Sequence, residues 1–277
     1  MSNIINAIIN MVNSPVTRLA FHYQSNNRAN SLGEALEEYV KDLFAGAIHS
    51  SEEERLERIT KTFSYVGNAN NPPDAMLQGG DAIEVKKIMS SNSALALNSS
   101  YPKQYLFADN KLITTACRNA EKWHKKDMIY VIGNVDKQNN IRHICMVYGK
   151  DYCAEDEVYS RVKTKIKEGV ESIPNIEFAE TNELGKINKI DPLGVTYLRV
   201  RGMWGIDNPW KVFNYVYERD MSKAFTFMSI INDEKWNALI DTERLVALEK
   251  TESDLHIKEI QIKDPDNPAK LRSVFVA

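Results

Sequence analysis

The stretch that most constrains how this chain can fold is NNPPDAMLQGGDAIEVKKI, residues 70–88. Turn residues lead into a short apolar run, a glycine pair interrupts it, and a second apolar run follows, which predicts a β-hairpin. Residues two apart share one face of a strand, so Glu84 and Lys86 point away from Ile83 and Val85. A carboxylate and an ammonium are costly to bury unless they pair or bind something. This strand face is therefore a candidate site.

The length of the hairpin loop decides whether a second acid joins Glu84 and Lys86. Asp74 lies on the first strand of the hairpin. A two-residue loop pairs Asp74 with Val85 and turns it to the wrong face, whereas a three-residue loop pairs it with Glu84 or Lys86. Three-residue loops usually hold a glycine in the left-handed conformation, and two glycines are available here. We therefore expect the odd loop and a cluster of two carboxylates and a lysine.

Such a cluster has a definite chemical use. Carboxylate oxygens bind Mg²⁺, which keeps several waters and binds phosphate oxygens. The metal stabilises charge on a phosphodiester and makes a bound water more acidic. Asp74 and Glu84 are thus candidate metal ligands, and Lys86 can orient the attacking water or help to deprotonate it. The expected reaction is hydrolysis of a phosphodiester.

The composition is that of a globular protein, and its net charge gives no overall attraction for nucleic acid. Its 277 residues are 43% hydrophobic and 26% charged, with a net charge of −3. A polyanionic partner must therefore meet a local basic patch. The three cysteines are an odd number without a C-x-x-C motif and are expected to be reduced thiols. No repeat or Pro/Gly-rich linker divides the chain, so we expect one α/β domain.

Periodicity predicts several further elements. Helices are expected at the N-terminus up to Pro15, from a Ser31–Glu34 capping box to residue 47, over 50–66 and over 154–173. Strands are expected at 128–135, 141–149, 193–206 and 223–231. The last 40 residues carry no clear pattern. The N-terminal segment has neither the basic start nor the unbroken apolar core of a signal peptide, and no run would span a membrane. We expect a cytoplasmic protein.

Pro73-Asp74, nine further residues and then Glu84-Val85-Lys86 resemble the PD-(D/E)-x-K signature of a large nuclease superfamily. The short pattern is loose, because Asp109-Asn110-Lys111 and Asp233-Glu234-Lys235 also fit variants of its second half. Longer segments resemble the NgoPII-type restriction endonucleases over most of the chain, from residue 3 to about 216: SALALNSSYPK, KDMIYVIGNV, ETNELGKINKIDPLGVTYLRVRGMW and NPWKVF.

This resemblance implies a restriction-endonuclease-like α/β fold, in which helices flank a mixed central sheet. It implies a single endonuclease domain over residues 1–277, with the catalytic hairpin at 72–88 and the DNA-recognition elements C-terminal to it. The implied protein is a Mg²⁺-dependent homodimer that cuts double-stranded DNA at a short GC-rich palindrome, with GGCC as the candidate site. A cognate DNA methyltransferase is expected in the same system, without direct contact. The superfamily often adds a carboxylate from a preceding helix, which makes Glu37 a further catalytic candidate; the alternative is an exposed helix glutamate.

Candidate DNA-binding residues lie after the hairpin. Arg199 and Arg201 are two apart on one predicted strand face, and arginine can read guanine O6 and N7 or bind phosphates. The alternative is that both arginines are solvated or pair with internal acids. The segment LNSSYPK offers small donors and a lysine for phosphate or groove contact; its alternative is an ordinary loop. Its candidates are Asn98, Ser99, Ser100 and Lys103.

Other residues are expected to be structural. Lys125 and Lys126 are interpreted as solvated charges, and His143, inside an apolar strand, as a packed or hydrogen-bonded residue. Two functions compete with restriction: a structure-selective or repair nuclease that uses the same site, and a DNA-binding protein in which the site is inert. Discrete plasmid fragments separate the first from restriction, and a neighbouring methyltransferase gene argues against the second.

Overall fold

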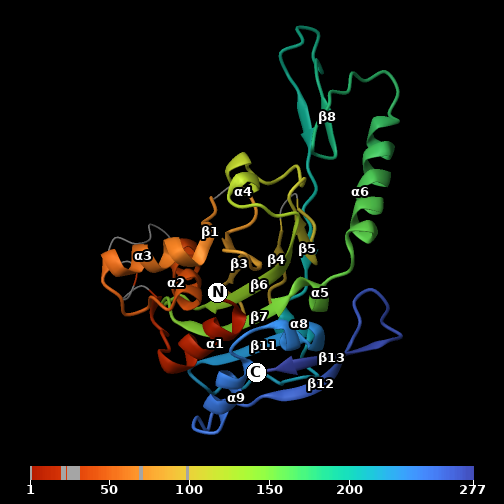
Figure 1. Cartoon of the computed structure of the whole chain (residues 1–277). Helices are drawn as coiled ribbons and strands as arrows, with labels where there is room; N and C mark the ends of the chain where they lie inside the picture. Colours follow the sequence, from red (N-terminus) through yellow and green to blue (C-terminus); the bar gives the residue numbers. More distant parts are fainter. Residues whose placement is uncertain (1, 20–22, 24–31, 69–70, 98–99) are drawn as a thin grey trace.

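The computed structural model describes residues 2–19, 23, 32–68, 71–97 and 100–277, and a nine-stranded sheet lies at its centre (Figure 1). Its strand order is β1-β2-β3-β6-β7-β11-β13-β12, with β5 paired to β6. The β3/β6 and β7/β11 pairs are parallel and the other neighbours are antiparallel. The predicted mixed sheet is confirmed. Its strands are β1 Phe63–Tyr65, β2 Ala75–Leu77, β3 Ala82–Ile88, β5 Tyr105–Phe107, β6 Lys125–Val135, β7 Ile141–Tyr148, β11 Thr226–Asn232, β12 Lys258–Lys263 and β13 Leu271–Val276.

Two apolar cores lie on opposite faces of this sheet. Ile83 and Val85 of β3 belong to the core that packs against helices α1 and α2, whereas Ala82 and Ile88 belong to the other core. The alternation predicted for β3 is therefore confirmed. The helices outside the arm described below are α1 Ile4–Asn13, α2 Leu32–Ala45, α3 Glu52–Thr62, α4 Thr115–Asn119, α5 Gly149–Tyr152, α7 Pro209–Val212, α8 Asp233–Ala238 and α9 Thr242–Glu249.

Local sequence signals explain where several helices begin and end. The side chain of Asn3 caps α1, which ends at Asn13 with Ser14 as its C-cap, just before Pro15, as predicted. Ser51 and Glu54 form a reciprocal capping box at the start of α3. The predicted box at the start of α2 involves Ser31, which lies outside the described residues. The residues that carried no clear pattern supply α9, β12 and β13, and β13 extends the sheet by pairing with β11.

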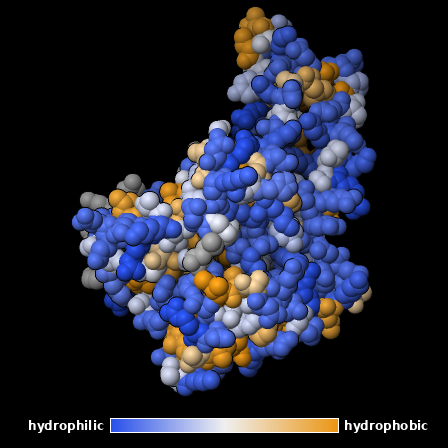
Figure 2. All heavy atoms as spheres, viewed as in Figure 1, coloured by the Kyte–Doolittle hydropathy of each residue, from blue (hydrophilic) through white to orange (hydrophobic). Residues whose placement is uncertain are grey.

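An arm stands out from the sheet at the top and right of Figure 1. It consists of α6 (Asp156–Glu171) and the two-stranded ribbon of β8 (Gly185–Ile187) and β9 (Leu198–Val200). No residue of α6 is buried, and Leu193 in the ribbon's connection is 85% exposed. Figure 2 shows apolar side chains gathered at the end of this arm.

The single strand predicted over 193–206 is wrong. Its residues form β9 and then β10 (Gly205–Ile206), which pairs with β4 (Leu95–Ala96) instead of β8. The chain changes partners between the two strands, so the apolar pattern of the segment serves two separate sheets. The other predicted long elements are present, with ends that differ by a few residues. The helix predicted over 50–66 is wrong at its end, because Phe63–Tyr65 leaves the helix and pairs with β2 as β1.

Two further expectations can be compared with the described part of the chain. Cys117, Cys145 and Cys153 are free and buried, as reduced structural thiols should be. Within the described residues, no helix combines the length and the apolar character needed to cross a membrane.

Candidate active site

The β2–β3 hairpin has the predicted odd loop. Ala75 pairs with Ile83 and Met76 with Ala82, so the same register places Asp74 opposite Glu84. The loop is residues 78–80, closed by a hydrogen bond from the Leu77 N–H to the Asp81 carbonyl at 2.9 Å. Gly79 has a φ of +63°, the left-handed conformation that glycine adopts without strain. The register brings Asp74, Glu84 and Lys86 to one side of the hairpin.

The three side chains form a compact charged cluster. The Lys86 Nζ donates to Glu84 Oε1 at 2.6 Å, and the Val85 N–H donates to Asp74 Oδ2 at 2.6 Å. The second Glu84 oxygen, Oε2, is buried and makes no hydrogen bond with the described residues. A buried carboxylate oxygen without a donor is costly, because it has lost water without a replacement. Glu84 is therefore well suited to an added cation.

The electrostatics of the cluster reflect this burial. Desolvation, followed by the charge of Glu84, raises the pKa of Asp74 to about 7, although Lys86 opposes the shift. Burial alone would lower the pKa of Lys86, but the charges of Glu84 and Asp74 outweigh burial and raise it. Lys86 is thus an ammonium in this state of the site, a donor and a positive charge rather than a ready base.

Glu37 on α2 lies within electrostatic range of the cluster. It is half-buried, and burial raises its pKa, while Lys41 and Lys86 pull the pKa down and Glu84 raises it. The alternative, that Glu37 is an exposed glutamate on a helix, does not agree with this partial burial. Its part in catalysis stays a prediction.

The donor set fits a magnesium ion that shares its coordination with water and substrate. Among the described residues, no group of three or more His, Cys, Asp and Glu side chains is placed to hold a metal ion by itself. Mg²⁺ is usually held by one or two carboxylates and completed by waters and phosphate oxygens. Asp74 and the unpartnered Glu84 Oε2 are oxygen ligands of that kind. The residues present therefore fit this ion.

Gly67 is a residue of the site region that sequence reasoning missed. Its φ is +59°, and a Cβ on it would lie 2.3 Å from the Asp74 carbonyl oxygen. Only glycine lets the backbone before the hairpin approach Asp74 this closely. A glycine in an ordinary loop gives no sequence signal of this role.

Gly67→Ala should therefore destabilise the fold by about 1–3 kcal/mol and reduce cleavage, because the chain must shift at Asp74. Thermal unfolding and a cleavage time course measure the two effects. Gly169→Ala is the matched control, since a Cβ there meets nothing within 4 Å and alanine favours the helix. Wild-type stability and cleavage in Gly67→Ala would contradict the close approach.

The interpretation of Lys126 as a solvated charge is wrong. Its side chain is 4% exposed and forms an ion pair with Glu121, because β6 carries it under the hairpin loop. His143 is packed, as expected: it is 2% exposed and its ring hydrogen-bonds Thr226.

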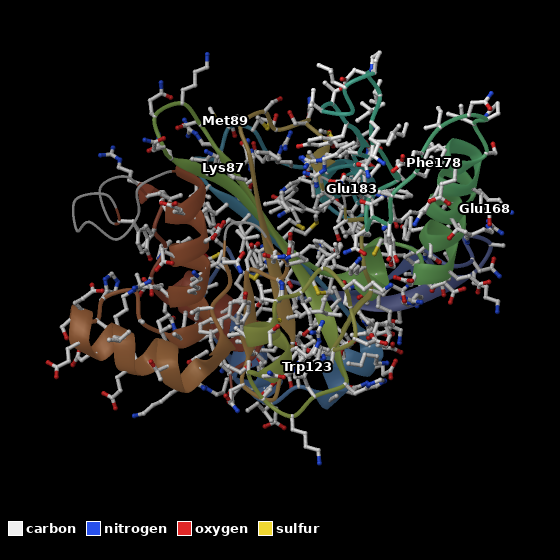
Figure 3. All side chains as sticks on the ribbon, turned by 90° about the horizontal axis from the view of Figure 1, so that it is seen from above. Lys87, Met89, Trp123, Glu168, Phe178 and Glu183 are labelled. Carbon is white, nitrogen blue, oxygen red and sulfur yellow. The ribbon has the colours of Figure 1, made fainter. Side chains whose placement is uncertain are left out.

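The structure holds Arg199 and Arg201 on one shared acid in the arm. Arg199 Nε and Nη2 donate to the two oxygens of Glu183 at 2.8 and 2.7 Å, and Arg201 Nε lies 2.8 Å from Glu183 Oε1. Figure 3 shows Glu183 on the arm, with Phe178 between it and α6, whereas Lys87 and Met89 mark the far end of β3. Both guanidinium groups are about half exposed, with side-chain exposures of 46% and 59%. The alternative, that both arginines pair with an acid, is therefore present in the structure. Both side chains are still exposed enough to donate hydrogen bonds to DNA, and contact with DNA stays a prediction.

The LNSSYPK segment is described only in part, since Asn98 and Ser99 lie outside the described residues. Ser100 is half-buried beside β4. Lys103 is 6% exposed and its Nζ lies 3.9 Å from the centre of the Tyr101 ring. Burial, against the attraction of Asp156, lowers the pKa of Lys103 to about 8. Lys103 is therefore not an open surface lysine, and DNA contact by it or Ser100 is untested.

A mixed sheet with flanking helices and a hairpin bearing two carboxylates and a lysine is the architecture of the restriction-endonuclease-like class. The chain matches the NgoPII restriction endonuclease family over residues 2–263. It is also 59% identical over 271 residues to the type II restriction enzyme NgoPII of Neisseria gonorrhoeae, covering 98% of this chain and 97% of that enzyme. The chain belongs to the NgoPII restriction endonuclease family. No solved structure matches it.

Proposed function

We propose that this chain is a Mg²⁺-dependent type II restriction endonuclease that cuts both strands of DNA at a short GC-rich palindrome, with GGCC as the candidate site. The observation that carries the proposal is the Asp74–Glu84–Lys86 cluster in a member of this family. The similarity to a type II restriction enzyme supports site-specific cleavage. A sheet with strands drawn from residues 63 to 276 supports a single endonuclease domain over 1–277.

Asp74 and Glu84 would hold Mg²⁺, which when bound supplies positive charge to the scissile phosphate and acidifies water. Glu84 offers the unpartnered Oε2 while Oε1 keeps the Lys86 ammonium in place. The Val85 N–H fixes the Asp74 carboxylate against the hairpin. Lys86 then orients the attacking water and stabilises negative charge on the phosphate. Glu37 would add a further carboxylate from α2.

The raised pKa of Asp74 predicts a metal requirement that depends on pH. The carboxyl has a pKa of about 7, so it is neutral below that pH and must lose a proton before it can bind Mg²⁺. The Mg²⁺ concentration for half-maximal cleavage should rise by up to about tenfold per pH unit as the pH falls below about 7, and level off above it. Magnesium titrations at about pH 6, 7 and 8 measure this, and a constant midpoint between pH 6 and 7 would contradict it.

Digestion of a sequenced plasmid tests the proposed function. With Mg²⁺, the protein should give discrete fragments whose mapped ends share one short palindrome, and EDTA should prevent cutting. A repair or structure-selective nuclease, the competing activity, would leave no fixed set of ends. Absence of any cutting with either Mg²⁺ or Mn²⁺ would favour the inert DNA-binding protein.

A two-fold homodimer follows from the proposed target. A palindrome presents one half-site twice, so a protein with one active site per chain is expected to pair around a two-fold axis. Each subunit would then cut one strand. The unmodified host genome would contain the same sites, which is why a methyltransferase of the same specificity is expected to accompany the enzyme.

A further inference from the structure

The register of the candidate catalytic hairpin depends on a short ladder. β2 has three residues, and two of them, Ala75 and Met76, are paired with β3. A slip of one residue moves every side chain of a strand to the other face. With the two-residue loop Gly79-Gly80, Asp74 would pair with Val85, and its side chain would point to the opposite face of the hairpin from Glu84. The short ladder alone therefore gives weak control of a feature on which the site depends.

The hairpin loop is held from outside by Lys126. β6 runs parallel to β3 with Ala82 paired to Met128, so Lys126 lies level with Gly80. Its Nζ donates to the carbonyl oxygens of Leu77 at 3.0 Å and Gly80 at 2.6 Å. One buried ammonium thus binds the residue before the three-residue loop and the last residue within it.

Glu121, just after α4, completes this contact. It forms the ion pair with Lys126, and its Oε2 accepts the Gly79 N–H at 2.8 Å. The pair therefore engages three backbone groups that have these positions only when the loop spans residues 78–80. Figure 3 shows Trp123, two residues beyond Glu121, at the opposite end of the sheet from Lys87 and Met89. The pair thus acts at the turn end of the hairpin.

We infer that Lys126 and Glu121 are positioning residues, which set the three-residue loop and so place Asp74 opposite Glu84. The inference rests on the proposed function, because it concerns the same cluster. A second anchor lies on the other strand face: Asp81 accepts from the Tyr148 hydroxyl at 2.8 Å and pairs with Lys235 Nζ at 2.6 Å. That anchor fixes the residue after the loop, whereas Lys126 and Glu121 bind the loop itself.

The test is the double variant Lys126→Met/Glu121→Gln, which removes both charges together and avoids leaving one buried and unpaired. Single-turnover cleavage at saturating cognate DNA should fall about 10- to 100-fold, because a displaced Asp74 spoils the geometry of reaction. The DNA concentration that gives half-maximal rate should stay within about threefold of wild type, since the loop lies outside the segments that are expected to bind DNA. Exposed Lys122→Met is the control and should match wild type.

A second double variant isolates the contact with Gly79 and again leaves no buried charge unpaired. Lys126→Met/Glu121→Gln keeps an acceptor for the Gly79 N–H, whereas Lys126→Met/Glu121→Ala lacks it and should show a further selective loss of rate. If the double variants do not fold, Glu121→Ala, which leaves Lys126 its two carbonyl acceptors, takes their place and should show a selective loss of rate. The inference is overturned by a wild-type rate in Lys126→Met/Glu121→Gln or in Glu121→Ala, by equal rates in the two double variants, or by parallel losses of rate and DNA affinity.

Asp74→Ala in the same assay separates this inference from the proposed function. An active Asp74→Ala protein means that the site assignment has failed, whatever the loop variants do. An inactive Asp74→Ala protein together with fully active loop variants means that the positioning inference alone has failed.

Discussion

Asp74→Ala, Glu84→Ala and Lys86→Ala should each lower the rate of DNA cleavage by at least about 10²- to 10⁴-fold, while specific DNA binding survives. The reason is that these groups serve the metal and the attacking water, whereas sequence reading is expected elsewhere in the chain. Lys86 and Glu84 are joined at 2.6 Å, so losing either also disturbs the other. Glu37→Ala should lower the rate less, because Glu37 comes from α2 outside the hairpin, and burial rather than Glu84 or Lys86 is the main cause of its raised pKa.

The measurement is single-turnover cleavage with Mg²⁺, beside cognate DNA binding with Ca²⁺ in its place. Lys87→Ala, on the same strand but outside the cluster, is a matched control for the lysine. Wild-type turnover in any one of the three variants removes that residue from the site. Loss of specific binding together with cleavage would mean instead that the variant has lost its fold or its contact with DNA.

Arg199→Ala or Arg201→Ala should reduce discrimination at one base pair of the target by about 1–3 kcal/mol, because one of them is predicted to read a guanine with two hydrogen bonds. Glu183 holds both guanidinium groups on the exposed arm, so it would orient them or be displaced by the base. Loss of a phosphate contact, by contrast, would weaken binding to every sequence alike.

Binding of each variant to the cognate duplex and to a set of singly substituted duplexes, with Ca²⁺ in place of Mg²⁺, distinguishes these outcomes. Lys189→Ala is a suitable control, since this exposed lysine of the arm pairs with Glu177 and is not a predicted reader. Equal loss of affinity for all duplexes in both arginine variants would exclude base reading by either. Specificity would then be sought in the LNSSYPK segment.

Patterns within short windows were the ones that sequence reasoning read correctly. The alternation of 82–88 separates Glu84 from Val85 by the geometry of any strand, whatever surrounds it. Likewise, the Asn-rich helix α1 ends at Asn13, with Ser14 as its C-cap, because Pro15 cannot continue it. These features depend on neighbours in sequence, so the sequence contains their whole cause.

Contacts between segments that are distant in the sequence could not be predicted from these local patterns. Lys126 has the composition of a surface residue, and only the parallel pairing of β6 with β3 places it under the hairpin loop. Residues 193–206 read as one strand, yet they divide between β9 and β10 because two different partners, β8 and β4, are available in space. The close approach of Gly67 to Asp74 is another contact that the local sequence pattern does not predict.

The sequence by itself therefore determined the chemical content of the candidate site: two carboxylates and a lysine at a spacing that a hairpin can bring together. It favoured a three-residue loop, but it left open two positions of that loop, of which one pairs Asp74 with Glu84 and the other pairs Asp74 with Lys86. The tertiary structure decided between them, since Lys126 and Glu121 bind the backbone groups of the three-residue loop. The physical reason is that side-chain alternation is a property of one strand alone. The register of a hairpin instead depends on which of several possible pairings of two strands has the lowest free energy, and contacts from other segments of the chain decide that.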